Sequence, residues 1–352
     1  MLGSLLPWAA GAAVAAAAAP RYLVPRPGVY RPDAEKSPPC WNLGNHRDGG
    51  DSADGSEVLR VCQINVWSGS TYELEPEGAS TAYQLFFGSF GSFEKDGQRE
   101  ARRAALVKEL KALRPAVVTL NEAASSAWVR ELADELGMCA VWHSGVAVVR
   151  LGPLALPPSI DEGDAILFHS DLECEHVARQ RLSGLVWGER LAFNFGDATQ
   201  ALGVLLKTPV GRRLYVIGTH WQASLIEDEG CRQAVAALAQ AQVQDAGTEA
   251  AQRWRRRDLV LAEGNRLIKE GTAMRVEESE GVLALLKSAA AQRADAAVVM
   301  GDLNTTPATP EILMLIERGG LVDGWTKVGE GGETWVRTQA PPPPRLGVQG
   351  CL

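Results

Sequence analysis

The chain has 352 residues, of which 46% are hydrophobic, and a formal net charge of −8 at pH 7. This length accommodates one large or two ordinary domains, and the composition is that of a globular protein. The acidic balance excludes a surface that binds polyanions over its whole extent, but it is compatible with a local phosphate site. The 6 cysteines are scattered, without the short paired spacings of a zinc site.

The amino-terminal region has two parts that we expect to lie outside the folded domain. Residues 1–20 are apolar and of low complexity, which favours a removable leader for secretion or for an organelle. Pro7, Gly11 and the high alanine content argue against a stable membrane span. Residues 21–56, rich in Pro, Gly, Arg and Asp, are predicted to be a disordered linker. We therefore expect the folded domain over residues 57–335 and an irregular tail over residues 336–352.

The first two predicted strands, over residues 58–67 and 116–120, both lead to polar side chains. Asn65 lies at the end of the first strand and Glu122 follows the second. A carboxylate in such a position is costly unless it is paired or metal-bound, so Glu122 is a candidate Mg²⁺ ligand. The alternatives are a turn-initiating asparagine and a solvated acid that precedes a helix. Helices are predicted over residues 98–113 and 125–136.

Three more strands are predicted over residues 163–168, 201–207 and 212–218, and His220 follows the last of them. A histidine at a strand end can donate to a phosphoryl oxygen, although a lone histidine is more often structural. Residues 226–295 are rich in Ala, Gln and Glu and polar on most faces. They separate two core strands by about 70 residues, far more than an ordinary connection, so we predict a helical insertion. Its basic cluster, residues 253–257, is more typical of a solvated helix face than of the alternative, a contact with nucleic-acid phosphates or an anionic membrane surface.

The segment AAVVMGDLNTTP, residues 296–307, reads as a buried strand that stops at Gly301 and leads into a polar turn. If the backbone stays extended, Asp302 and Asn304 point the same way. The carboxylate can orient a water molecule or hold a hard cation, and the amide can donate to a phosphate oxygen. The alternative is an ordinary turn, because Asp and Asn are common there. A helix is predicted over residues 309–318.

Five segments in this order, INVW, LNEA, GDAILF, GTHW and MGDLNTTP, resemble the endonuclease/exonuclease/phosphatase superfamily. The resemblance implies an α/β fold, a four-layer sandwich of two mixed β-sheets flanked by helices. It also implies a phosphoesterase site at the strand ends that depends on Mg²⁺ or Mn²⁺. By this resemblance Asn65 and Glu122 hold the metal, and His220, Asp302 and Asn304 are the catalytic residues. His220 stabilises the phosphate in the transition state, Asp302 aligns the attacking water, and Asn304 binds a phosphate oxygen.

The resemblance leaves three hypotheses about the phosphate-ester partner. The order of GDAILF and GTHW is similar to nocturnin-type deadenylases, which favours RNA or a nucleotide. The apolar leader and GDLNTTP are similar to neutral sphingomyelinases, which favours a phospholipid headgroup. The family's final Ser-Asp-His triplet does not follow Asn304 in this sequence, so we expect a truncated form with reduced activity. A non-catalytic phosphate-binding protein on the same fold is the third hypothesis.

Overall fold

The computed structural model describes residues 28–33, 35–37, 40, 59–66, 70–72, 90–92, 98–123, 126–144, 149–151, 154–156, 163–183, 199–243 and 250–324. The predicted leader, most of the predicted linker and the predicted tail lie outside these described residues. No helix in the described part is long and apolar enough to cross a membrane.

The described residues form both helices and strands, with a long run of strands from Cys139 to His220 in the middle of the chain. The helices are α3 (Gln98–Leu113), α4 (Ser126–Leu136), α5 (Glu229–Val243), α6 (Ala250–Leu286), the 3₁₀ helix η3 (Ala291–Arg293) and α7 (Pro310–Gly319). The strands are β1 (Val29–Tyr30), β2 (Val61–Asn65), β3 (Ser70–Tyr72), β4 (Phe90–Ser92), β5 (Val117–Ala123), β6 (Cys139–Ser144), β7 (Val149–Leu151), β8 (Leu154–Leu156), β9 (Gly163–Phe168), β10 (Glu173–Arg181), β11 (Gln200–Lys207), β12 (Arg213–His220) and β13 (Ala296–Asp302).

Two mixed sheets form the centre of the molecule. One has the strand order β1-β6-β9-β5-β2 and the other the order β10-β11-β12-β13. In each sheet the last pair is parallel, β2 with β5 and β12 with β13, and the remaining pairs are antiparallel. The pairs β3–β4 and β7–β8 form two further antiparallel sheets of two short strands each.

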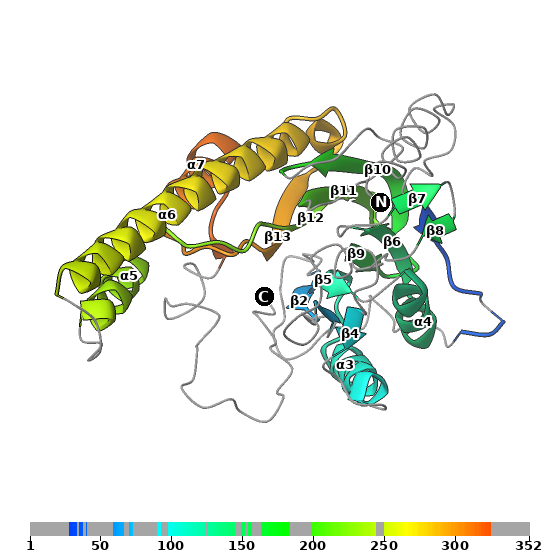
Figure 1. The fold of residues 1–352 in the computed structure, drawn as a ribbon. Helices are drawn as coiled ribbons and strands as arrows, with labels where there is room; N and C mark the ends of the chain where they lie inside the picture. The colour runs from blue at the N-terminus through cyan, green and yellow to red at the C-terminus, as the bar shows by residue number, and fades with distance from the viewer. Residues whose placement is uncertain are drawn as a thin grey trace.

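Apolar side chains hold the layers together in three clusters. The central cluster lies between the sheets and joins, for example, Ile166 of β9 to Val216 of β12. A second cluster packs α3 and α4 on the five-stranded sheet, and a third packs α6 and α7 on the four-stranded sheet. Figure 1 shows these helices on opposite sides of the paired sheets. The arrangement confirms the predicted four-layer α/β sandwich, and burial of apolar area is the main term that stabilises it.

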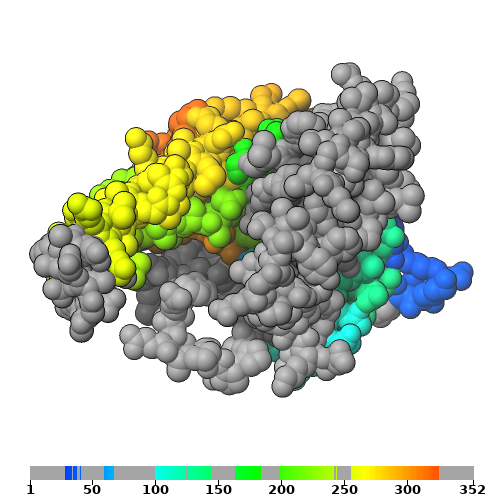
Figure 2. Space-filling model, in the orientation of Figure 1, coloured from blue at the N-terminus to red at the C-terminus, as the bar shows by residue number. Residues whose placement is uncertain are grey.

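The region predicted as a helical insertion contributes directly to one of these layers. In Figure 1, α5 lies beside the amino-terminal part of α6, away from the sheets, and α6 forms a long ridge in Figure 2. Its carboxyl-terminal half buries Val282 and Leu283 against the four-stranded sheet. That half is therefore part of the sandwich, which corrects the prediction of an insertion over the whole of residues 226–295. The sequence of this helix is polar on most faces because its buried face also contains Arg275 and Glu278, which have polar partners.

The predicted linker also needs a correction, since β1 lies within it. Val29 and Tyr30 pair antiparallel with β6 and form the edge of the five-stranded sheet. The Tyr30 hydroxyl donates to Asp134 at 2.7 Å, and the Arg130 guanidinium lies 5.5 Å from the centre of the tyrosine ring. These tertiary contacts order a short segment whose composition alone is typical of disorder.

Candidate functional site

The carboxyl ends of the two parallel strand pairs meet at one rim of the sandwich. In the first pair Asn65 of β2 stands opposite Asn121 of β5, and in the second His220 of β12 stands opposite Asp302 of β13. Because parallel strands end at the same level, polar residues at their ends share one edge of the sheet. The packing of the two sheets then brings both edges together.

Asn65 lies at the centre of this rim and contacts both sheets. Its side-chain nitrogen donates to Oε1 of Glu122 at 2.8 Å and to Oδ2 of Asp302 at 2.9 Å. Nε2 of His220 lies 3.8 Å from the same Glu122 oxygen. The side chains of His220 and Glu122 are 25% and 23% exposed, so a ligand can reach both.

Asn304 joins the cluster through a backbone conformation that was not predicted from the sequence. Its φ of 46° places it in the left-handed region, so the expectation of an extended backbone from Asp302 to Asn304 is wrong. The backbone N–H of Asn304 donates to Oδ1 of Asp302 at 3.1 Å, and this Asx-type turn is accessible to asparagine. Its side-chain nitrogen lies 3.2 Å from Nε2 of His220 and donates to the Trp221 carbonyl at 2.8 Å.

Backbone strain is concentrated at this rim. Glu122 has a φ of 55°, and together with Asn304 it accounts for two of the three positive-φ residues other than glycine in the described part of the chain. A left-handed conformation costs a residue such as glutamate roughly 1–2 kcal/mol. The pairing of β5 with β9 shifts register between Leu120 and Ala123, so Glu122 lies in a bulge that redirects its side chain. Strain of this kind is common at functional sites.

Asn121 is a residue whose role the sequence analysis missed. It is fully buried, and its side-chain nitrogen donates to Oδ1 of Asp164 at 2.8 Å and to the Thr219 carbonyl at 3.1 Å. Its side-chain oxygen accepts from Nε2 of Gln63 at 2.9 Å and from the backbone N–H of Asp302 at 2.9 Å. All four hydrogen-bonding positions of the amide are therefore used, and the bonds join both sheets next to the rim. The available signal was an amide directly after the apolar run of a buried strand.

Asp164 lies buried behind the rim. Burial raises the pKa of this carboxyl above its ordinary value of 3.8, while the charge of His220 and the hydrogen bond from Asn121 lower it. The nearby charge of Glu122 raises it further. Burial is the largest of these effects, so the pKa of Asp164 lies above its ordinary value.

The donor set at the rim fits a divalent cation that is only partly bound by protein. In the described part of the chain, no three His, Cys, Asp or Glu side chains lie close enough to hold a metal ion on their own. Glu122 and Asp302, however, direct carboxylate oxygens at the same amide nitrogen of Asn65. Mg²⁺ typically uses one or two carboxylates and completes its shell with water and substrate phosphate. Mg²⁺ and Mn²⁺ take oxygen ligands, so these residues fit such an ion through their carboxylate oxygens and the side-chain oxygen of Asn65, not through the Asn65 nitrogen.

A comparison with protein-family models gives a match to the endonuclease/exonuclease/phosphatase family over residues 62–348, most of the chain. The chain belongs to this family. Members of this family are phosphoesterases, so the rim described above is the candidate active site. No curated protein matches the chain by sequence.

Three solved structures similar to this chain hold a sulfate, a nucleoside vanadate or a DNA product. The human nocturnin catalytic domain with bound sulfate is 16% identical, with 74% of this chain and 68% of that chain covered and a TM-score of 0.43. ANGEL2, a 2′,3′-cyclic phosphatase, in complex with adenosine-2′,3′-vanadate, is 15% identical, with 74% and 57% covered and a TM-score of 0.43. TDP2 from D. rerio, in complex with a single-stranded DNA product, is 15% identical, with 78% and 71% covered and a TM-score of 0.41.

Proposed function

We propose that this protein is a phosphodiesterase that depends on Mg²⁺ or Mn²⁺ and acts on RNA or a nucleotide. The observation that carries the proposal is the convergence of Glu122 and Asp302, from opposite sheets, on the side chain of Asn65. Carboxylate oxygens are the groups that bind Mg²⁺ directly or through its water ligands, and here two of them accept from one amide nitrogen. His220 and Asn304 add hydrogen-bond donors beside the pair.

In this proposal the residues divide into a cation-binding set and a phosphate-binding set. Glu122 and Asn65 would hold the divalent ion. When bound, such an ion neutralises phosphate charge and polarises the ester. His220 and Asn304 would donate to phosphoryl oxygens, where negative charge develops in the transition state.

Asp302 would accept a hydrogen bond from the attacking water and so align it for in-line attack. Its carboxylate is held in place by the Asn65 side chain at 2.9 Å and by the Asn304 backbone N–H at 3.1 Å. Its own backbone N–H is fixed by Asn121. A carboxylate held this firmly can align the attacking water with little reorganisation.

The order of the segments GDAILF and GTHW supports RNA or a nucleotide as substrate. A phospholipid headgroup is the second candidate, favoured by the apolar leader. A protein that binds phosphate esters at this rim without turnover is the third candidate.

The test is an assay of the purified chain against poly(A), a dinucleotide and sphingomyelin, each with Mg²⁺, with Mn²⁺ and with EDTA. We expect hydrolysis of poly(A) or the dinucleotide that EDTA abolishes and that excess Mn²⁺ restores. Hydrolysis of sphingomyelin alone would favour the lipid candidate, and binding of AMP without turnover would favour the non-catalytic one. Hydrolysis that persists in EDTA would overturn the proposal.

A further inference from the structure

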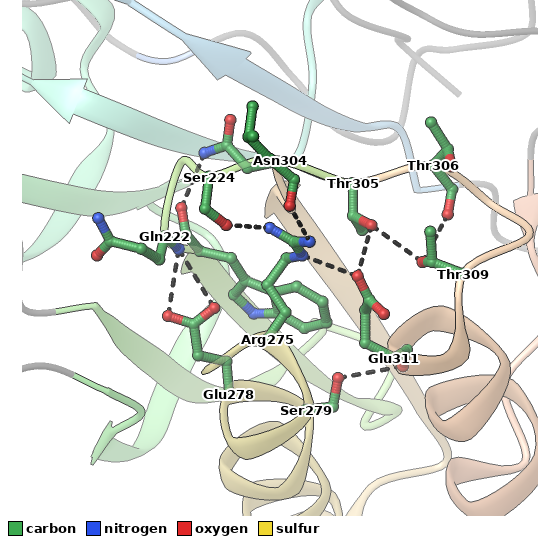
Figure 3. Close-up of polar contacts among 12 residues, drawn as sticks. Gln222, Ser224, Arg275, Glu278, Ser279, Asn304, Thr305, Thr306, Thr309 and Glu311 are labelled. Atoms are coloured by element: carbon green, nitrogen blue, oxygen red, sulfur yellow. Dashed lines mark hydrogen bonds and ion pairs between the residues drawn. The ribbon is translucent and has the colours of Figure 1, made fainter. Parts of the chain in front are cut away.

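The buried face of α6 carries a polar network that reaches the two segments next to the candidate site. Arg275, Glu278 and Ser279 of this helix are fully buried, as is Glu311 of α7. Figure 3 shows these side chains beneath the segment after β12, which includes Gln222 and Ser224, and beneath the turn that contains Asn304 and Thr305. Buried charges are retained in a fold when each has partners, so the partners indicate what the network holds.

Arg275 holds the segment after β12 at two points and contacts α7 at a third. Its Nη2 donates to the Leu225 carbonyl at 3.0 Å, and its Nη1 donates to the Ser224 hydroxyl. Its Nε donates to Oε1 of Glu311 at 2.8 Å. A planar guanidinium can reach three acceptors in fixed directions, whereas a lysine ammonium cannot.

Glu278, one helical turn further along α6, holds the same segment nearer to His220. Both of its carboxylate oxygens accept from the backbone N–H of Gln222, each at 3.2 Å. Oε1 also accepts from the Ser183 hydroxyl at 2.6 Å and from the Thr199 hydroxyl. Gln222 is two residues after His220, so this bond anchors the chain directly beyond the end of β12.

The helix backbone approaches this segment closely enough to require a glycine. A β-carbon at Gly271 would lie 2.8 Å from the Leu225 carbonyl oxygen and would overlap the Ser224 hydroxyl. The segment is therefore packed directly against α6, one turn before Arg275. Side-chain bonds and backbone packing act on the same few residues.

Glu311 connects this arrangement to the turn that carries Asn304. The carboxylate oxygen that accepts from Arg275 also accepts from the Thr305 hydroxyl at 2.7 Å. The Thr305 and Thr309 hydroxyls lie 2.9 Å apart. Thr305 directly follows Asn304, so one oxygen of Glu311 links α6 to the backbone next to a candidate phosphate-binding residue.

We propose that Arg275, Glu278 and Glu311 are positioning residues that fix His220 and Asn304 relative to each other. The consequence for catalysis rests on the proposed function, but the positioning itself does not. The two held segments already meet at the site, where the Asn304 side chain donates to the Trp221 carbonyl at 2.8 Å. A buried ion pair is often a poor source of net stability, which favours a role in holding a geometry.

The decisive test compares Thr305→Val with Thr305→Ser. Valine keeps the shape of threonine but cannot donate to Glu311, whereas serine keeps the hydroxyl. We expect kcat to fall about tenfold in Thr305→Val with KM little changed, because small displacements of catalytic groups reduce rate more than binding. Thr305→Ser should restore the wild-type rate. Arg275→Lys, which keeps the charge but loses the three-way geometry, should resemble Thr305→Val.

A readout that does not depend on turnover separates this inference from the proposed function. In ¹H–¹⁵N spectra, the His220 imidazole and the Asn304 side-chain amide should shift in Thr305→Val and remain as wild type in Thr305→Ser. If the wild type hydrolyses nothing but these shifts are seen, the positioning role stands and the proposed function falls. Equal spectra and equal rates for the valine and serine variants would overturn the positioning role, even if Arg275→Lys fails to fold.

Discussion

The side-chain nitrogen of Asn65 lies 2.9 Å from Oδ2 of Asp302, although 237 residues separate the two in the chain. The contact joins β2, at the edge of one sheet, to β13, the edge of the other within the described residues. The same nitrogen also donates to Glu122. A single amide therefore contacts both carboxylates, and the site depends directly on how the two sheets pack.

Replacing Asp302 with asparagine tests the proposed alignment of water. The change is nearly isosteric but removes the charge that would attract and orient a water proton. We expect kcat to fall at least about a hundredfold, a typical loss for a group that assists proton transfer. The measurement is hydrolysis of the dinucleotide with Mn²⁺, with Asp258→Asn on the exposed side of α6 as the matched control. Wild-type activity in Asp302→Asn would contradict the assigned role.

Replacing Asn121 with aspartate tests the bridge behind the site. The variant loses both donated hydrogen bonds and places a second acid beside Asp164. We expect the free energy of unfolding to fall by about 3 kcal/mol, since each buried group left unsatisfied costs about 1–3 kcal/mol. Urea denaturation measures this, and Gln292→Glu makes the same amide-to-acid change at an exposed position. Equal urea midpoints for Asn121→Asp and Gln292→Glu would contradict the stabilising role of the Asn121 bridge.

Replacing Gly301 with alanine tests the close pairing of β13 with β12 at the rim. A β-carbon there would overlap the Thr219 carbonyl group, 2.7 Å from its carbon atom. Since backbone atoms cannot move aside locally, we expect a loss of more than about 3 kcal/mol in the free energy of unfolding. Gly320→Ala is the control, because no atom lies within 4 Å of its added carbon. The left-handed φ of residue 320 should cost the alanine variant only about 1 kcal/mol. Similar losses of unfolding free energy in both variants would show that the close approach of Gly301 to Thr219 does not limit stability.

The buried carboxyl of Asp164 predicts a pH dependence of stability. Burial raises its pKa in the folded protein above the ordinary 3.8, so the folded state holds this proton more tightly than the unfolded chain does. The resulting stabilisation is complete below pH 3.8 and is lost as the pH rises from there through the folded-state pKa. Over this window the unfolding free energy of Asp164→Asn should vary less with pH than that of the wild type. Above the window, the variant should be more stable relative to the wild type than it is at low pH. Denaturation at a series of pH values, with Asp258→Asn as the exposed control, measures the difference, and parallel curves for wild type and Asp164→Asn would refute it.

Much of the fold was predicted from local patterns. The helix expected over residues 98–113 is α3 with the same bounds, and those expected over 125–136 and 309–318 are confirmed within one residue. The strand over residues 163–168 is β9. These segments are regular because apolar periodicity, caps and turn residues act over a few positions. Strand β10 was missed because its exposed face carries charged and polar side chains.

Local sequence patterns predicted which polar residues follow the core strands, and the order of the motifs indicated the family. Three features became visible only in the folded chain: Asn65, Glu122 and Asp302 meet, Glu122 and Asn304 adopt left-handed backbone conformations, and Asn121 bridges the sheets. Secondary structure follows from interactions between near neighbours in the chain. Convergence at the rim depends instead on strand pairing and sheet packing between segments far apart, and no local pattern encodes those distances.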